Sequence, residues 1–383
     1  MKEIGKIKDA CTVIAGQSPK GTSYNENGEG MEFHQGKKAF GESIIESSNV
    51  WTTEITKIAE PGDILMSVRA PVGPTNITDR KICIGRGLAA IRCNKDIIPH
   101  YILYALRNIE SKIIGNDGAV FNSINKKQIE DLPLPLLSLA EQQSIVDYLD
   151  SAFAKIDAMK ANAEKALNEA KALFQASLKE MLEPKEGWEE KKVGDIAEIK
   201  GGKRLPKGEK LLSEPTNHKY IRVADFNEYG TVDLDDIQYI SDKVYEQIKR
   251  YIIKKEDIYL SIAGTIGKSG IIPEELDGAN LTENACRLIL SKEVYQRFMY
   301  YTTISPEFIR QENENTKISA QPKLALTRLA EILIAYPSIA EQQNIVATLD
   351  SLKSKVDKLQ ENYNKISLEC DALKQAILRQ VFE

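Results

Sequence analysis

An internal repeat constrains this chain more than any other feature. The segment 138–146, SLAEQQSIV, returns 200 residues later at 338–346 as SIAEQQNIV. Aligned without a gap, residues 138–183 and 338–383 are identical at 21 of 46 positions. A repeat of this kind means that the chain builds one structural plan twice. We therefore expect the order globular unit, helix, globular unit, helix.

The repeat continues upstream with gaps. Gly16 matches Gly202 at an offset of 186 residues, and Gly73 matches Gly267 at an offset of 194. The offset reaches 200 at the repeated helices, so the second globular unit contains 14 extra residues. Identity is high in the helical segments and scattered before them. This contrast predicts a nearly symmetric scaffold that carries two different globular units.

Both repeated segments have the periodicity of long helices. Apolar residues alternate at spacings of four and three over about four heptads, which is typical of a coiled-coil seam. The predicted seam consists of Ile145, Leu149, Ala152, Ile156, Met159, Ala163, Ala166, Ala170 and Leu173, and of Ile345, Leu349, Leu352, Val356, Leu359, Tyr363, Ile366, Cys370, Leu373 and Ile377. Neither segment contains an internal Pro or Gly, and Pro184 ends the first. Because the first helix leads to the second unit and the second helix must return, the pairing is expected to be antiparallel.

The globular units are predicted to be mixed α/β. Short β-rich runs such as 64–68 and 258–262 are bounded by turn residues, and one amphipathic helix is expected in each unit, near 99–109 and 294–301. The predicted fold class is α+β, with two mixed α/β units joined by two long antiparallel helices in a pseudo-twofold repeat. The expected domains are 1–139, the helix 140–183, 184–339 and the helix 340–383.

Composition excludes several classes of protein. The chain has 51 basic and 56 acidic side chains, a net charge of −5, so it is not a strongly basic nucleic-acid binder. No apolar run approaches the roughly 18 residues that a membrane helix needs, and the first residues do not resemble a signal peptide. The five cysteines are odd in number and lack C-x-x-C spacing, which favours reduced thiols and a cytoplasmic location.

Catalytic motifs are not evident. The segment 264–269, GTIGKS, resembles a phosphate-binding loop, but Ile262 stands where the first glycine is required. Gly270 and Pro273 also disfavour the helix that should follow, so a turn between strands is expected. The three histidines are isolated and lack metal-ligand spacing. We therefore expect no catalytic residue, no metal site and no cofactor bound by this chain.

Local basic patches are the remaining candidates for binding DNA. The loop 200–210 carries five cations, and its counterpart at 16–21 is weaker. Lysine and arginine at such sites contact phosphates, and arginine also reaches base edges. The candidate DNA-binding residues are Lys20, Lys37, Lys38, Arg69, Arg80, Lys81, Arg86, Lys200, Lys203, Arg204, Lys207 and Arg222.

Several motifs together resemble the specificity subunit of type I restriction–modification systems, over essentially the whole chain. They are Gly187-Trp188-x5-Gly194-Asp195, Gly62-Asp63-Ile64-Leu65, Gly87-Leu88-Ala89, Phe121-Asn-Ser-Ile-Asn125, Leu132-Pro-Leu-Pro135, Leu139-Ala-Glu-Gln-Gln143 and Ala340-Glu-Gln-Gln343. The first unit departs from the pattern by opening with Ile4-Gly5. The second has Ile332-Leu-Ile-Ala335 in place of Leu-Pro-Leu-Pro.

The resemblance implies that each globular unit is a target-recognition domain for one half of a bipartite, double-stranded DNA site. It implies that the coiled coil sets the spacer and docks two methyltransferase subunits. S-adenosylmethionine would then belong to those subunits, which methylate adenine, and ATP and Mg to a motor–nuclease subunit. The polar residues at the two helix starts are the docking candidates: Glu141, Gln142, Gln143, Glu341, Gln342 and Gln343.

Two other classes of protein remain open from the sequence. A structural coiled-coil tether accounts for the helices but not for two matched α/β units. A nucleotide-hydrolysing enzyme requires a functional Lys268, which nucleotide titration against the isolated chain would test.

Overall fold

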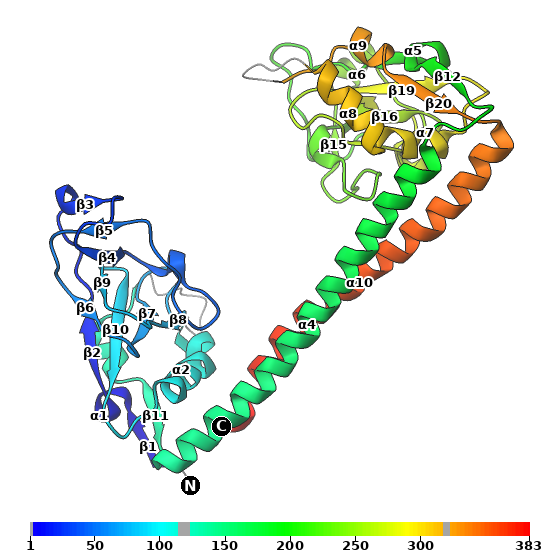
Figure 1. The fold of residues 1–383 in the computed structure, drawn as a ribbon. Helices are drawn as coiled ribbons and strands as arrows, with labels where there is room; N and C mark the ends of the chain where they lie inside the picture. Colours follow the sequence, from blue (N-terminus) through cyan, green and yellow to red (C-terminus); the bar gives the residue numbers. More distant parts are fainter. Residues whose placement is uncertain (1–2, 114–122, 317–321) are drawn as a thin grey trace. The chain divides into compact units, whose positions relative to one another are not determined.

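The computed structural model describes residues 3–113, 123–316 and 322–383 (Figure 1). Residues 121 and 122 of the predicted Phe121–Asn125 motif lie outside this part. The chain forms two compact units, residues 1–163 with 364–383 and residues 164–363. Each unit therefore combines one globular part with portions of both long helices.

The first unit begins at β1 and includes the start of helix α4. Its elements are β1 (Glu3–Lys6), α1 (Ile7–Ala10), β2 (Cys11–Ala15), η1 (Gly21–Ser23), β3 (Tyr24–Asn25), β4 (Met31–His34), η2 (Lys37–Ala39), β5 (Trp51–Thr52), β6 (Ile58–Ala59), β7 (Ile64–Ser67), β8 (Thr75–Ile77), β9 (Ile82–Ile84), β10 (Leu88–Cys93), α2 (Pro99–Ile113), α3 (Lys126–Glu130), β11 (Pro133–Leu136) and α4 (Leu139–Leu182).

The second unit repeats this order with some additions. Its elements are β12 (Glu189–Lys192), α5 (Val193–Ile196), β13 (Ala197–Gly201), β14 (Lys219–Ile221), η3 (Val223–Asp225), β15 (Gln238–Tyr239), α6 (Asp242–Ile248), β16 (Ile258–Ser261), β17 (Ser269–Gly270), η4 (Glu274–Leu276), β18 (Asn280–Leu281), β19 (Ala285–Leu290), α7 (Gln296–Thr303), α8 (Pro306–Asn315), α9 (Leu326–Ala330), β20 (Leu333–Tyr336) and α10 (Ile339–Phe382).

Each long helix is a single uninterrupted element of 44 residues, about 66 Å long at 1.5 Å per residue. A capping box starts α4, since Ser138 N–H donates to Glu141 Oε2 at 2.9 Å and Glu141 N–H donates to Ser138 Oγ at 3.4 Å. Without proline or glycine inside, nothing interrupts the backbone hydrogen bonds. The predicted long helices are confirmed.

The two helices pair antiparallel within each unit. In the first unit, Lys160 Nζ lies 3.6 Å from Asp371 Oδ1. In the second, Lys171 Nζ donates to Gln360 Oε1 at 2.7 Å. Higher residue numbers on α4 are thus paired with lower residue numbers on α10. The two pairs are also equivalent under the 200-residue offset, because Lys160 corresponds to Gln360 and Lys171 corresponds to Asp371. The pairing of the helices therefore follows the sequence repeat.

The predicted seam is only partly correct. Leu149, Ile156, Leu349 and Val356 are buried as expected, but Met159 (59% exposed), Leu173 (60%) and Leu373 (46%) face outward. The side chains that are buried on α4 instead include Leu167, Phe174 and Leu178. The prediction assumed a 3.5-residue period, whereas an almost straight helix has a period of about 3.6 residues, so a strict heptad drifts off the buried face.

The globular part of both units is built around the same four-stranded antiparallel sheet. Its strand order is β2-β10-β7-β8 in the first unit and β13-β19-β16-β17 in the second. The register corresponds, since Ile91 pairs with Val13 and Ile64, and Leu288 pairs with Ile199 and Ile258. Helices α2 and α7 carry buried tyrosines, Tyr101 and Tyr301, into the two main cores. The mixed α/β prediction is confirmed.

A second sheet differs between the units. The first unit has a five-stranded sheet, β3-β5-β4-β9-β6, and the second has three strands, β15-β14-β18. Both keep one parallel strand pair, β4–β9 and β14–β18. The two units therefore share the four-stranded sheet and differ in this second sheet and its loops.

Candidate nucleic-acid interface

Three chain segments meet at one end of the four-stranded sheet of the first unit. Gly16 N–H donates to Leu88 O at 2.9 Å, Gln17 N–H to Ile84 O at 3.0 Å, and Gly85 N–H to His34 O at 2.8 Å. A Cβ on Gly16 would lie 2.2 Å from the Gly85 carbonyl oxygen, so only glycine fits where the loop leaves β2. We call residues 16–24, 34–38 and 85–87 the first loop cluster.

The second unit builds the same junction with different residues. Gly202 N–H donates to Ala285 O at 2.9 Å, Lys203 N–H to Leu281 O at 2.8 Å, and Thr282 N–H to Ile221 O at 3.0 Å. A Cβ on Gly202 would lie 2.0 Å from the Thr282 carbonyl oxygen. Residues 202–210, 221–222 and 282–284 form the second loop cluster. Each bond has its counterpart in the first unit, so the clusters are structurally equivalent.

Some of the predicted basic residues gather at these clusters. Lys20, Lys37, Lys38 and Arg86 are exposed in the first cluster. Lys38 and Arg86 line a pocket of about 730 Å³ together with polar and aromatic residues that sequence reasoning did not single out, namely Ser18, Tyr24, Gln35 and Asn49. The basic loops 16–21 and 200–210 and the matched glycines Gly16 and Gly202 point to this place in the sequence, but nothing there singles out these polar and aromatic residues.

The second cluster carries most of the predicted basic loop. Lys203, Arg204 and Lys207 are exposed there, and Lys200 lies just before them on β13. Lys203 Nζ sits 5.4 Å from the centre of the Tyr251 ring, and Arg204 Nε donates to Glu283 Oε1 at 2.6 Å. Lys200 pairs with Glu198 at 2.9 Å. The loop thus presents several cations next to one carboxylate.

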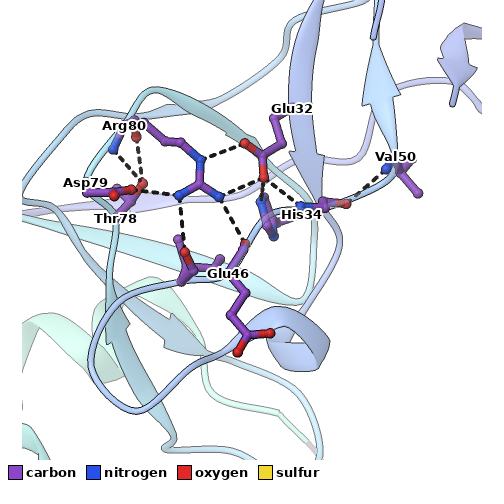
Figure 2. A network of polar contacts seen from close by, with 9 residues as sticks. Glu32, His34, Glu46, Val50, Thr78, Asp79 and Arg80 are labelled. Atoms are coloured by element: carbon purple, nitrogen blue, oxygen red, sulfur yellow. Dashed lines mark hydrogen bonds and ion pairs between the residues drawn. The ribbon is translucent and has the colours of Figure 1, made fainter. Parts of the chain in front are cut away.

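Arg80 lies in a polar network (Figure 2), and its side chain is 31% exposed. Its guanidinium donates to both carboxylate oxygens of Glu32, at 2.7 and 2.9 Å, and to the main-chain oxygens of Ile45 and Glu46. Glu32 and His34 are buried, and His34 Nε2 lies 2.9 Å from Glu32 Oε1. Arg80 therefore has a structural role, because its donors hold the first unit together, and its DNA contact stays a prediction.

The charge state of this network follows from its bonds. Burial on its own would raise the pKa of Glu32, but donors from Arg80, Ser48 N–H and His34 outweigh it and lower the pKa to about 2. Burial lowers the pKa of His34, which favours a neutral ring. A carboxyl with a depressed pKa stabilises the fold above its unfolded value of 4.5, and this contribution is lost as the pH falls towards 2.

Arg222 has the same kind of structural role in the second unit. It forms ion pairs with Asp225 at 2.5 Å and Asp236 at 3.0 Å, and Asp225 is buried. The contact of Arg222 with DNA likewise stays a prediction. The other candidates, Arg69 and Lys81, are exposed, and Lys81 pairs with Glu60 at 3.2 Å.

We predict that replacing Arg80 with alanine destabilises the first unit by about 2 kcal/mol, because it leaves a buried carboxylate unpaired. Lys81→Ala, the neighbouring exposed cation, should cost under about 0.5 kcal/mol. Chemical denaturation of both variants near pH 7 measures the difference. Equal effects of the two substitutions would show that the Glu32 network is not structurally important.

The glutamines proposed for docking are structural as well. Gln142 and Gln342 are both completely buried. Gln142 Oε1 accepts the Ile98 N–H at 2.9 Å, while its Nε2 donates to Asp96 O and Leu137 O. Gln342 repeats this with the Tyr295 N–H, Glu293 O and Pro337 O. These side chains anchor each long helix to its own unit, so they cannot reach a partner.

The remaining docking candidates lie at the surface. Gln143 and Gln343 are exposed, and Gln143 Nε2 donates to Asp147 Oδ1 at 2.7 Å. Glu141 Oε2 accepts the Ser138 N–H at the start of α4, and Glu341 Oε1 accepts the indole N–H of Trp188 at 3.2 Å. Within each repeated E-Q-Q triplet, the middle glutamine thus anchors the helix.

The predicted turn between strands is confirmed at this segment. Residues 264–268 lie in the turn between β16 and β17, and strand β17 follows directly. Lys268 Nζ donates to Phe226 O at 2.9 Å. Within residues 3–113, 123–316 and 322–383, no group of three or more His, Cys, Asp or Glu side chains is arranged to hold a metal ion.

Comparison with known proteins places this architecture. The family model described as the type I restriction modification DNA specificity domain matches residues 2–169 and again residues 185–368. The chain belongs to this family. It carries the specificity domain twice, and each match takes in one globular part and most of the long helix that follows.

Individual relatives agree with this assignment. The putative type I restriction enzyme MjaX specificity subunit of Methanocaldococcus jannaschii is 46% identical over 140 residues, which cover 36% of this chain and 32% of that protein. The EcoBI specificity subunit of Escherichia coli is 25% identical over 357 residues, covering 84% of this chain and 73% of that protein. The matched share of the relatives thus ranges from about a third to about three quarters.

Solved structures from type I restriction–modification systems share the fold. A chain from a study of complex assembly and conformational transition of the type I restriction–modification system aligns with a TM-score of 0.79 at 17% identity, over 100% of this chain and 97% of that one. The HsdS subunit from Thermoanaerobacter tengcongensis aligns with a TM-score of 0.55 at 16% identity, over 99% and 96% of the two chains. The predicted α+β fold with two long helices is confirmed.

The helices give no sign of a membrane span. In the part of the chain that the structure describes, none is both long and apolar enough to cross a bilayer.

Proposed function

We propose that this chain is the DNA-specificity subunit of a type I restriction–modification complex, in which each unit recognises one half of a bipartite DNA site. The observation that supports this most is the pair of equivalent loop clusters, which share their backbone bonds and differ in side chains. A scaffold that presents two different surfaces in the same way suits a site with two different halves. A simple coiled-coil tether would not require them.

The partners follow from the same proposal. The chain would work with two methyltransferase subunits that carry S-adenosylmethionine, and with a motor–nuclease subunit that uses ATP and Mg, while binding no cofactor itself. Apolar side chains exposed on the long helices, Met159 and Leu173 on α4 and Leu368 and Leu373 on α10, favour the helices as the docking surface. Such a subunit acts where the DNA lies, which we take to be the cytoplasm.

The basic loop of the second unit provides the test of DNA binding. We predict that replacing Lys203, Arg204 and Lys207 together with alanine weakens DNA binding, because the variant loses contacts to phosphates. Each lost contact should also reduce the slope of log affinity against log salt by roughly one unit. Titration of the complex with labelled duplex at several salt concentrations measures this slope.

A charge-matched control keeps this test specific. Lys249, Lys255 and Lys292 are exposed lysines of the same unit outside the second loop cluster. Their triple alanine variant should leave the salt slope close to that of the unmodified chain. If both triple variants bind with the same slope, the loop is not part of the DNA surface.

A further inference from the structure

One turn occupies the same position in both loop clusters but carries opposite charges. Leu88 N–H donates to Gly85 O at 3.0 Å in the first unit, and Ala285 N–H donates to Thr282 O at 3.2 Å in the second. The residue at the tip is Arg86 in the first case and Glu283 in the second. The structure thus aligns two residues that the sequence, with its changing offset, does not.

The main chain at Arg86 is held firmly. Its N–H donates to Ser18 Oγ at 3.2 Å, and Ser18 Oγ donates to Gln35 Oε1 at 2.9 Å. The flanking glycines pack against Gln35, since a Cβ on Gly85 would lie 2.5 Å from Gln35 Oε1 and one on Gly87 would lie 2.4 Å from Gln35 O. These contacts fix the turn relative to Gln35.

The Arg86 guanidinium remains available, and Gln35, whose Oε1 accepts from Ser18 Oγ, keeps its Nε2 amide group as a donor. Both residues are exposed, and among the residues that the structure describes, none forms an ion pair with the Arg86 guanidinium. Both line the pocket of about 730 Å³, which also contains Tyr24 stacked on Phe33 at 5.0 Å between ring centres. A rigid turn that presents unpaired donors beside an amide is suited to hydrogen bonding with a base edge, since arginine pairs with guanine O6 and N7 and glutamine with adenine N6 and N7.

The second cluster presents a different set of donors and acceptors. Glu283 accepts from Arg204, and although burial alone would raise the pKa of Glu283, the Arg204 guanidinium and other donors lower it, so the carboxylate is charged at neutral pH. Arg222 stands where Gln35 stands in the first unit, but Asp225 and Asp236 engage it. A carboxylate at the tip accepts from the amino group of cytosine, which arginine cannot do.

We propose that this turn position is where each unit reads a base of its half-site, through Arg86 with Gln35 in the first unit and through Glu283 with Arg204 in the second. The proposal rests on the proposed function, and it adds which residues determine the sequence. Arg86 acts as a base reader and not only as a phosphate contact.

The experiment maps methylated adenines in cells that express this chain with its methyltransferase partner. Arg86→Ala and Gln35→Ala should each relax the motif within one half-site and leave the other half-site and the spacer unchanged. Glu283→Ala should relax the opposite half-site. Binding of Arg86→Ala to the original site should weaken about 10- to 100-fold, with little change for a site altered at the relaxed position.

A matched control and a stability measurement separate the outcomes. Lys95→Ala removes an exposed cation of the first unit outside the first loop cluster and should leave the motif intact. Thermal unfolding of Arg86→Ala should match the unmodified chain, because an exposed side chain is removed. An unchanged motif for Arg86→Ala, or uniform weakening on all sequences with a flatter salt slope, would overturn the base-reading role. Failure of the unmodified chain to direct any bipartite methylation would overturn the proposed function instead.

Discussion

Inserting seven residues after Lys165 and seven after Lys365 is expected to abolish recognition of the native site or to select a site with a longer spacer. These positions are equivalent under the 200-residue offset, and the pairs Lys160–Asp371 and Lys171–Gln360 set an antiparallel register that the two insertions shift equally. Seven residues add about 10 Å of helix and fall only about 20° short of two full turns, so the packing survives. The same distance on DNA is about three base pairs, which also rotate the second half-site by roughly 100°.

Selection from a library of half-sites with varied spacers, with the methyltransferase partner present, measures the outcome. The bases within each half-site should stay the same, because the globular parts are untouched. As a control, insertion in α4 alone should disrupt the opposed contacts and reduce stability. Retention of the original spacer at full affinity after the double insertion would mean that the helices serve for docking only.

Leu178→Ala is expected to destabilise the second unit by about 3 kcal/mol, because Leu178 is completely buried and its truncation leaves a cavity. Leu173→Ala, five residues earlier on the same helix, should cost about 0.5 kcal/mol or less, since Leu173 is 60% exposed. Denaturant titration of the two variants provides the comparison. The heptad pattern read from the sequence predicts the reverse order, so a larger loss for Leu173→Ala would restore that pattern and contradict the helix packing described above.

The large features of the fold could be predicted because they depend on repeated local patterns. The repeat around Glu141-Gln-Gln143 and Glu341-Gln-Gln343 identified two equivalent helices, and connectivity required them to run antiparallel. The exact buried face could not be predicted in the same way. Alanine-rich helices carry apolar residues on more than one face, so Met159 and Leu173 fit a heptad that the packing does not use.

The candidate site was harder to predict because charges find partners far away in the sequence. Arg80 meets Glu32 across 48 residues, and Gln142 meets the Ile98 N–H across 44. Nothing in the local sequence distinguishes Arg80 from the exposed Lys81 beside it. The equivalence of Arg86 and Glu283 likewise depends on strand register, which the gaps in the repeat conceal.

Mapping methylated adenines across the source genome, with and without this chain, tests the central claim most directly. The account predicts a bipartite motif with two different half-sites and a fixed spacer, because the helices repeat closely while the loop clusters do not. The motif should disappear when the chain is deleted and return when it is supplied again. A palindromic motif, or methylation that persists unchanged without the chain, would contradict the account.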